Sequence, residues 1–255
     1  MHIDIDEKAH LNSVLHRMDI RFKIISILSA ALIISSCRSI NAALISVIYA
    51  LLLTLISGIA PAYYMKKTYY PLIFLLPLFI FLPLSSGGRV IYSISFISIY
   101  MEGILTSLLI SLKVIAIIIL VNIMLSTAPF RDTAAALKSM KVPDKMLNII
   151  LFTYRYFFVF FEDLRKMRVA LTLRGFRNRN GLSSLRSSAS LAGSILVRSY
   201  EQTERIYRAM LLRGYNGSII AHRKFNPSVS DLFLSVIIIA VPFAFLIAEI
   251  KGLFN

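Results

Sequence analysis

The chain is poor in the residues that build catalytic and cross-linked sites. Its 255 residues include one cysteine, Cys37, and only 13 aspartates and glutamates. A single cysteine excludes an internal disulfide, and with it an oxidised extracellular framework. The acids do not form the DxxD clusters that a membrane enzyme acting on isoprenoid diphosphates would need. Because the sequence also lacks a Gly-x4-Gly-Lys-Ser/Thr stretch, we expect no ATP hydrolysis by this chain.

Metal-binding residues are equally scarce. His2, Asp4 and His10 are a grouping that could hold a metal, but isolated surface histidines are the interpretation that we favour. We therefore expect no bound metal and no other cofactor. The chain also shows no internal repeat of the kind that a secondary transporter with paired broken helices would carry.

Apolar residues are abundant. They make up 57% of the chain, and the mean hydropathy is +0.74, well above what a soluble domain needs. The sequence therefore predicts an all-α integral membrane protein whose surroundings are the lipid bilayer. The net charge of +15 could indicate a nucleic-acid partner, but that function requires a water-soluble basic domain, so we expect none.

Five apolar segments are long enough to cross a bilayer core of about 30 Å. The third contains Pro71, Pro77 and Pro83, which remove helix hydrogen bonds. Between the third and fourth segments, residues 85–88 predict a turn. Residues 90–100 alternate serine with apolar side chains, which is compatible with a short strand or an interfacial segment. The five predicted spans are 22–37, 40–60, 69–84, 103–126 and 229–248.

A sixth apolar segment, residues 147–161, is not expected to cross. Arg155 lies at its middle, where a charge at the bilayer centre costs at least about 2.5 kcal/mol. Residues 131–224 hold 18 Lys and Arg against 6 Asp and Glu, a net +12. If the segment does not cross, this whole block is cytoplasmic, as the positive-inside rule prefers. We therefore expect the N-terminus inside and the C-terminus outside.

This reasoning divides the chain into three parts: four spans in residues 1–130, a cytoplasmic domain in 131–228 and a last span in 229–255. The cytoplasmic part should contain helices at about 132–141, 144–175 and 185–214. We expect Asp144 to cap the second, because its carboxylate can accept exposed backbone N–H groups. The second and third helices both end in Arg-Gly, at Arg174-Gly175 and Arg213-Gly214.

Two interpretations of these ends are open. Each is a helix cap at least, since a cation opposes the helix dipole and glycine accepts left-handed geometry. Each is also suited to capture a partner's carboxylate, because a guanidinium binds it through two hydrogen bonds. The repetition favours docking on a partner that is itself a pair of similar subunits.

Several motifs resemble the transmembrane T component of energy-coupling factor (ECF) importers. They are Tyr154-Arg155-Tyr156, Arg168-x-Ala170-x3-Arg174-Gly175-Phe176 and Glu204-Arg205-x2-Arg208-Ala209-Met210-x2-Arg213-Gly214-Tyr215. Lys8-Ala9-His10-x-Asn12 and Met18-Asp19-Ile20-Arg21-x-Lys23 are similar to the cobalt-uptake CbiQ branch.

The resemblance implies an L-shaped scaffold in the cell membrane. It would couple two ABC ATPase subunits to a CbiM-like substrate-binding subunit with a small CbiN-like subunit, for cobalt uptake. The alternative cargoes are nickel, biotin or the vitamins of a shared module. The ATPase-contacting residues carried over are Leu173, Arg174, Gly175, Leu212, Arg213 and Gly214, with Arg168, Ala170, Arg208, Ala209 and Met210 in support.

The chain departs from the family's pattern at both helix ends and in the N-terminal motif. Leu173 and Leu212 stand where alanine is usual, and Ile20 stands where proline is usual. Lys113, near the middle of the fourth span, is a further candidate. Two alternatives are open for it: a polar contact with the substrate-binding subunit, or an interior lysine satisfied by carbonyl groups.

Overall fold

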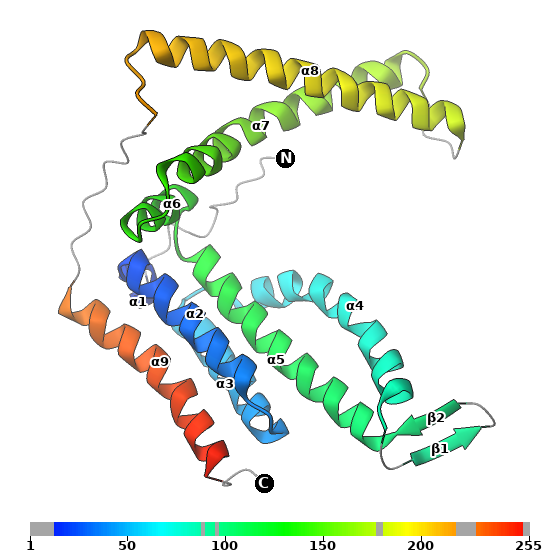
Figure 1. Cartoon of the computed structure of the whole chain (residues 1–255), viewed down its shortest axis with the longest axis vertical. Helices are drawn as coiled ribbons and strands as arrows, with labels where there is room; N and C mark the ends of the chain where they lie inside the picture. Colours follow the sequence, from blue (N-terminus) through cyan, green and yellow to red (C-terminus); the bar gives the residue numbers. More distant parts are fainter. Residues whose placement is uncertain (1–12, 88–89, 95–96, 177–180, 218–227, 252–255) are drawn as a thin grey trace. The chain divides into compact units, whose positions relative to one another are not determined.

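The computed structural model describes residues 13–87, 90–94, 97–176, 181–217 and 228–251. These residues are helical apart from one two-stranded hairpin, as Figure 1 shows, so the all-α prediction is confirmed. The chain forms two compact units. Unit 1 comprises Met1–Ala136 and Arg223–Asn255, and unit 2 comprises Leu137–His222.

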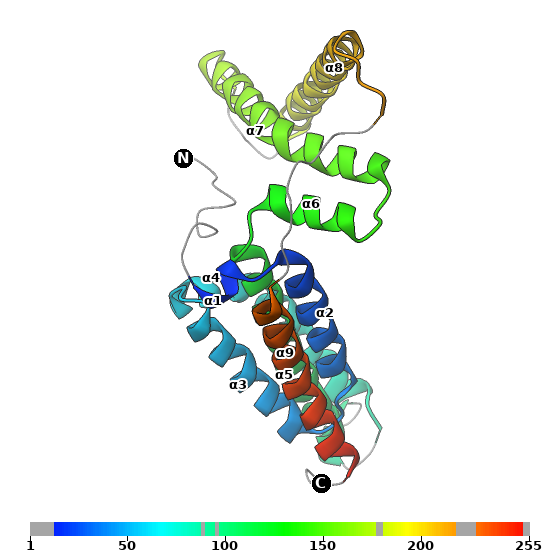
Figure 2. The same ribbon diagram turned by 90° about the vertical axis from the view of Figure 1, so that its left-hand side faces the viewer.

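Unit 1 is a bundle of long helices. The short α1 (Val14–Arg17) precedes α2, and α6 (Phe130–Ser139) starts in this unit. Its four central helices pack side by side (Figure 2). They are α2 (Ile20–Ser36), α3 (Ile40–Ile56), α5 (Met101–Ser126) and α9 (Val229–Ile250).

Three helices of the described chain are long and apolar enough to cross a membrane: the Lys67–Ser85 part of α4 (Pro61–Ser85), α5 and α9. Helix α3 is a shorter apolar helix of 17 residues. Helix α2 is also 17 residues long and carries Arg21 and Lys23 near its start. The chain is thus a multi-pass membrane protein, and the count of five spans stays a prediction.

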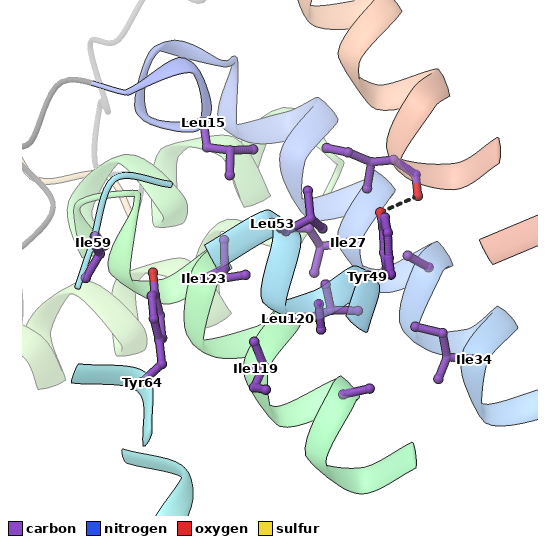
Figure 3. Close-up of a cluster of buried hydrophobic side chains, with 14 of the residues drawn as sticks. Leu15, Ile27, Ile34, Tyr49, Leu53, Ile59, Tyr64, Ile119, Leu120 and Ile123 are labelled. Carbon is purple, nitrogen blue, oxygen red and sulfur yellow. Dashed lines mark hydrogen bonds between the residues drawn. The ribbon is translucent and has the colours of Figure 1, made fainter. Parts of the chain in front are cut away.

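The core of unit 1 lies where α2, α3, α5 and α9 meet. Ile27, Leu53 and Leu120 are buried there with residues from all four helices (Figure 3). The Tyr49 hydroxyl donates a hydrogen bond of 2.8 Å to the Ile238 carbonyl, so the buried phenol is satisfied and α3 is tied to α9.

The C-terminal end of α9 is also tied to the bundle. One carboxylate oxygen of Glu249 accepts backbone hydrogen bonds from Arg38 and Ser39, each 2.6 Å long. Ser39 is the N-cap of α3, where unpaired N–H groups and the helix dipole favour an anion. Glu249 therefore joins α9 to the turn between α2 and α3.

Helix α4 remains continuous despite Pro71, Pro77 and Pro83. The segment that follows is strand-like: β1 (Val90–Ile94) pairs antiparallel with β2 (Ile97–Tyr100). At the start of α5, Gly103 allows close contact with α4. A methyl group built on Gly103 would lie 2.5 Å from the Leu82 carbonyl oxygen and 2.6 Å from the Pro83 Cα.

Unit 2 consists mainly of two long antiparallel helices, α7 (Asp144–Leu173) and α8 (Leu182–Leu212). The carboxylate of Asp163 lies 3.8 Å from Arg198 across the pair, and Leu164, Leu171 and Leu191 line a groove between them. The predicted cap at Asp144 is wrong. Its side chain accepts no capping bond and instead pairs with Lys138 at 3.0 Å, because Pro143 occupies the cap position.

Candidate functional site

The end of α7 is closed by two backbone hydrogen bonds. The Phe176 N–H donates to the Leu171 carbonyl at 3.1 Å, and the Gly175 N–H donates to the Thr172 carbonyl at 3.0 Å. Gly175 has φ of +84°, which a residue with a side chain rarely adopts. This is the Schellman arrangement, in which glycine follows the C-cap residue. Arg174 is that C-cap.

The end of α8 has the same geometry. The Tyr215 N–H donates to the Met210 carbonyl and the Gly214 N–H donates to the Leu211 carbonyl, both at 3.0 Å. Gly214 has φ of +80°, and Arg213 is the C-cap. The two ends therefore share one backbone arrangement, bond for bond.

Both ends present their side chains to the surroundings. Arg174 and Arg213 are exposed. The leucine before each is among the most exposed apolar residues of the chain: Leu173 is 83% exposed and Leu212 is 90% exposed. Each end thus combines an exposed arginine with an exposed apolar side chain, a pairing suited to an apolar groove that contains an acidic side chain.

The two arginine ends lie at opposite ends of the α7–α8 pair. Tyr215 contacts Asn148 in the first turns of α7, whereas Phe176 lines a groove with Ser188 near the start of α8. Since 26 residues of α7 separate Asn148 from Arg174, the ends are about 39 Å apart at about 1.5 Å per residue. The α7–α8 pair therefore holds its two arginine ends too far apart for a single groove to take both.

Asn148 is a residue that the sequence reasoning missed. Its side chain is 8% exposed, and its amide nitrogen donates to the Tyr215 hydroxyl and to the Gly217 carbonyl, each at 2.8 Å. The bonds hold the segment after Arg213 against the base of α7. An amide among the apolar residues at the start of α7 is a signal in the sequence, but it does not name a partner 67 residues away.

The five residues expected to support the arginine ends lie in the last turns of α7 and α8. Arg208 is held by an ion pair with Glu204, one helical turn earlier. Arg168 lines the groove between α7 and α8, and its carbonyl accepts from the Thr172 hydroxyl at 3.0 Å. Ala170 and Ala209 are exposed, and Met210 is half-buried.

Lys113 is satisfied within the chain. Its ammonium donates to the Ser35 carbonyl at 3.0 Å, in the last turn of α2. This is the interior-lysine alternative, and a contact with another subunit stays a prediction. His2, Asp4 and His10 lie outside the described residues. Within the described ranges, no group of three histidine, cysteine, aspartate or glutamate side chains could hold a metal ion.

Comparison with known proteins identifies the family. Residues 11–224 match the family CbiQ, described as cobalt transport protein. The chain belongs to the CbiQ family. The resemblance to the T component of ECF importers is thereby confirmed.

Relatives support this assignment over nearly the whole chain. The energy-coupling factor transporter transmembrane protein EcfT of Staphylococcus aureus is 28% identical, covering 95% of this chain and 95% of its own. The EcfT of Lactococcus lactis is 27% identical over 90% of this chain and 92% of its own length. The cobalt transport protein CbiQ of Rhodobacter capsulatus is 28% identical over 44% of this chain and 46% of its own.

Proposed function

We propose that this CbiQ-family chain is the scaffold that couples two ABC ATPase subunits to a substrate-binding membrane subunit. ATP-driven closure of the ATPases would move the two arginine ends, and the helices behind them would tilt the substrate-binding subunit. The chain itself would hydrolyse nothing.

The observation that carries this proposal is the identity of the two helix ends. A cap needs only the backbone geometry and places no demand on the residue before the arginine. Here both ends also expose a leucine and an arginine, and the two ends lie about 39 Å apart along one helix pair. Two equal grooves, one on each of two similar subunits, are the partner that this repetition fits.

The docking residues in this proposal are Arg174 and Arg213, with Leu173 and Leu212 entering the apolar part of each groove. Leucine in place of the family's usual alanine would favour a wider groove on this chain's own ATPases. The remaining residues would shape or hold the ends: Gly175, Gly214, Arg168, Ala170, Arg208, Ala209 and Met210.

The proposed orientation places unit 2 in the cytoplasm. Residues 131–224 carry a net charge of +12, and the positive-inside rule assigns such a block to the cytoplasmic side. The N-terminus is then cytoplasmic and the C-terminus extracellular. The proposed division remains residues 1–130 and 229–255 in the membrane, with 131–228 as the coupling part.

The proposed cargo is the cobalt ion, taken from a CbiM-like subunit with a small CbiN-like subunit. The family's description and the partial likeness to the CbiQ of Rhodobacter capsulatus support it. Nickel, biotin and the vitamins of a shared module stay as alternatives, because the longer likeness is to EcfT proteins, whose names specify no cargo. Uptake of radioactive Co²⁺, against Ni²⁺ and biotin, by cells that carry the whole importer separates these cargoes.

A charge reversal at both helix ends tests the docking. Arg174→Glu with Arg213→Glu should abolish co-purification of the ATPases, because each introduced glutamate would be repelled by the acidic side chain of its groove. The matched control is Arg165→Glu with Arg205→Glu, which makes the same change in net charge at exposed positions about two helical turns before Arg174 and Arg213. If the reversed ends still bring down the ATPases in stoichiometric amount, the proposal is wrong.

A further inference from the structure

Lys23 is a buried lysine in the first turns of α2. Its side chain is fully shielded from solvent, and its ammonium donates to the Thr127 carbonyl at 3.2 Å. Burying a charge is unfavourable unless it is paired or hydrogen-bonded, so a lysine retained in this place must be well satisfied. The bond joins residues 104 positions apart.

The Thr127 carbonyl is a group that α5 itself leaves open. Helix α5 ends at Ser126, and the last carbonyls of a helix have no partner within it. Pro129, two residues later, has no N–H to offer. A cation beside these carbonyls also opposes the negative end of the helix dipole. Lys23 therefore completes the C-terminus of α5.

The same place is where the chain turns from α5 into α6. The Thr133 N–H donates to the Pro129 carbonyl at 3.0 Å, which starts α6 directly after the turn. Ile20 and Ile24, on either side of Lys23 in α2, pack with Ala128 and Ala136 of the turn and of α6. Polar and apolar contacts thus hold the turn against one short stretch of α2.

Asp19 fixes the start of that stretch. It is the N-cap of α2, and its carboxylate accepts the Arg21 N–H at 3.0 Å. The ammonium of Lys23 is therefore presented from a capped helix rather than from a frayed end.

We propose that Lys23 is a positioning residue that locks the α5–α6 joint to α2. The first turns of α6 and the membrane bundle then move as one body. The role rests on the proposed function in one respect: a rigid joint lets a displacement of the coupling helices reach α2 instead of being lost in bending at Pro129.

The experiment measures the joint directly by electron paramagnetic resonance. Spin labels go on cysteines at Ile25 and Arg131, both exposed, in a Cys37→Ser background. The chain is measured alone in lipid nanodiscs, and again in the assembled importer with and without ATP. We expect one narrow distance distribution, unchanged by ATP, in the protein that retains Lys23. In Lys23→Met the distribution should broaden to several distances.

Thr127→Val is the matched control. It removes the hydroxyl that bonds the Ile123 carbonyl at 2.8 Å but keeps the backbone carbonyl that Lys23 binds. Its distribution should stay narrow, while melting curves report any loss of stability in each variant. If Lys23→Met does not fold, Lys23→Gln, which has a shorter side chain, takes its place.

Two results would overturn the inference: a narrow distribution without Lys23, or equal broadening in Thr127→Val. The measurement on the chain alone needs no ATPase, so it stands whatever the double arginine reversal shows. In turn, the outcome of that reversal does not change what the distance measurement on the chain alone shows about the joint.

Discussion

The arginine end of α8 is held by another helix of unit 2. Asn148 of α7 anchors the segment after Arg213 through two hydrogen bonds. The end of α8 is therefore held at the base of α7 as well as by its own cap.

Asn148→Asp tests this anchor with almost no change of shape. The carboxylate cannot donate to the Gly217 carbonyl, and an unsatisfied buried acceptor costs about 1 to 3 kcal/mol. Hydrogen exchange at residues 213–217 should quicken about tenfold for each 1.4 kcal/mol lost. Mass spectrometry of the purified chain measures it.

Exchange at residues 174–176 serves as the internal reference for that variant, because Asn148 does not contact them. Tyr215→Phe removes one of the two bonds and should give a smaller effect. Equal quickening at both arginine ends would show that the variant loosens unit 2 as a whole and that Asn148 is no specific anchor.

Among the helices, the contact of α4 with α5 is the tightest backbone approach at a described glycine. Gly103 makes it, and any Cβ there would meet the Leu82 carbonyl and the Pro83 backbone. Helix α4 contains three prolines, and a helix that loses hydrogen bonds to proline relies more on contacts with its neighbours.

Gly103→Ala should therefore destabilise unit 1. Overpacking against a backbone costs about 1 to 3 kcal/mol, and the thermal midpoint in detergent should fall accordingly. Gly193→Ala in α8 is the matched change. Nothing lies within 4 Å of its added methyl, so the better helix propensity of alanine should raise stability by up to about 1 kcal/mol. Equal effects of the two changes would refute the close contact.

The helices of this chain could be predicted where local chemistry decides. The signals that predicted the helices and both arginine ends each act within a few residues of the chain. They are the apolar runs, Pro143, and the glycines after Arg174 and Arg213. Asp144 was misassigned because Pro143 occupies the cap position, which leaves the carboxylate of Asp144 to pair with Lys138 of the preceding helix.

The contacts that organise the chain over longer distances left no such local pattern. Lys23 with Thr127, Asn148 with Tyr215 and Glu249 with Ser39 join residues 104, 67 and 210 positions apart. Each residue is polar in an apolar setting, which marks it as unusual. Its partner follows only from how the helices pack. The docking role of the arginines depends on other subunits and stays a prediction.

For the whole molecule, the uneven distribution of charge has a consequence that can be measured in cells. Cysteines placed at Leu182 and at Lys251, both exposed, report the two sides of the membrane in a Cys37→Ser background. A membrane-impermeant maleimide should label Lys251→Cys in intact cells and Leu182→Cys only after permeabilisation. The opposite pattern would contradict the proposed orientation.

The arginine ends also bear on the thermodynamics of assembly. Each is closed by bonds between residues no more than six positions apart along the chain, so its backbone takes its final form without any partner. Ordering a flexible loop on binding would weaken an interface of the same area. A partner that binds either end has only the arginine and leucine side chains to immobilise. Preorganisation of this kind lets a small contact bind firmly and release without unfolding.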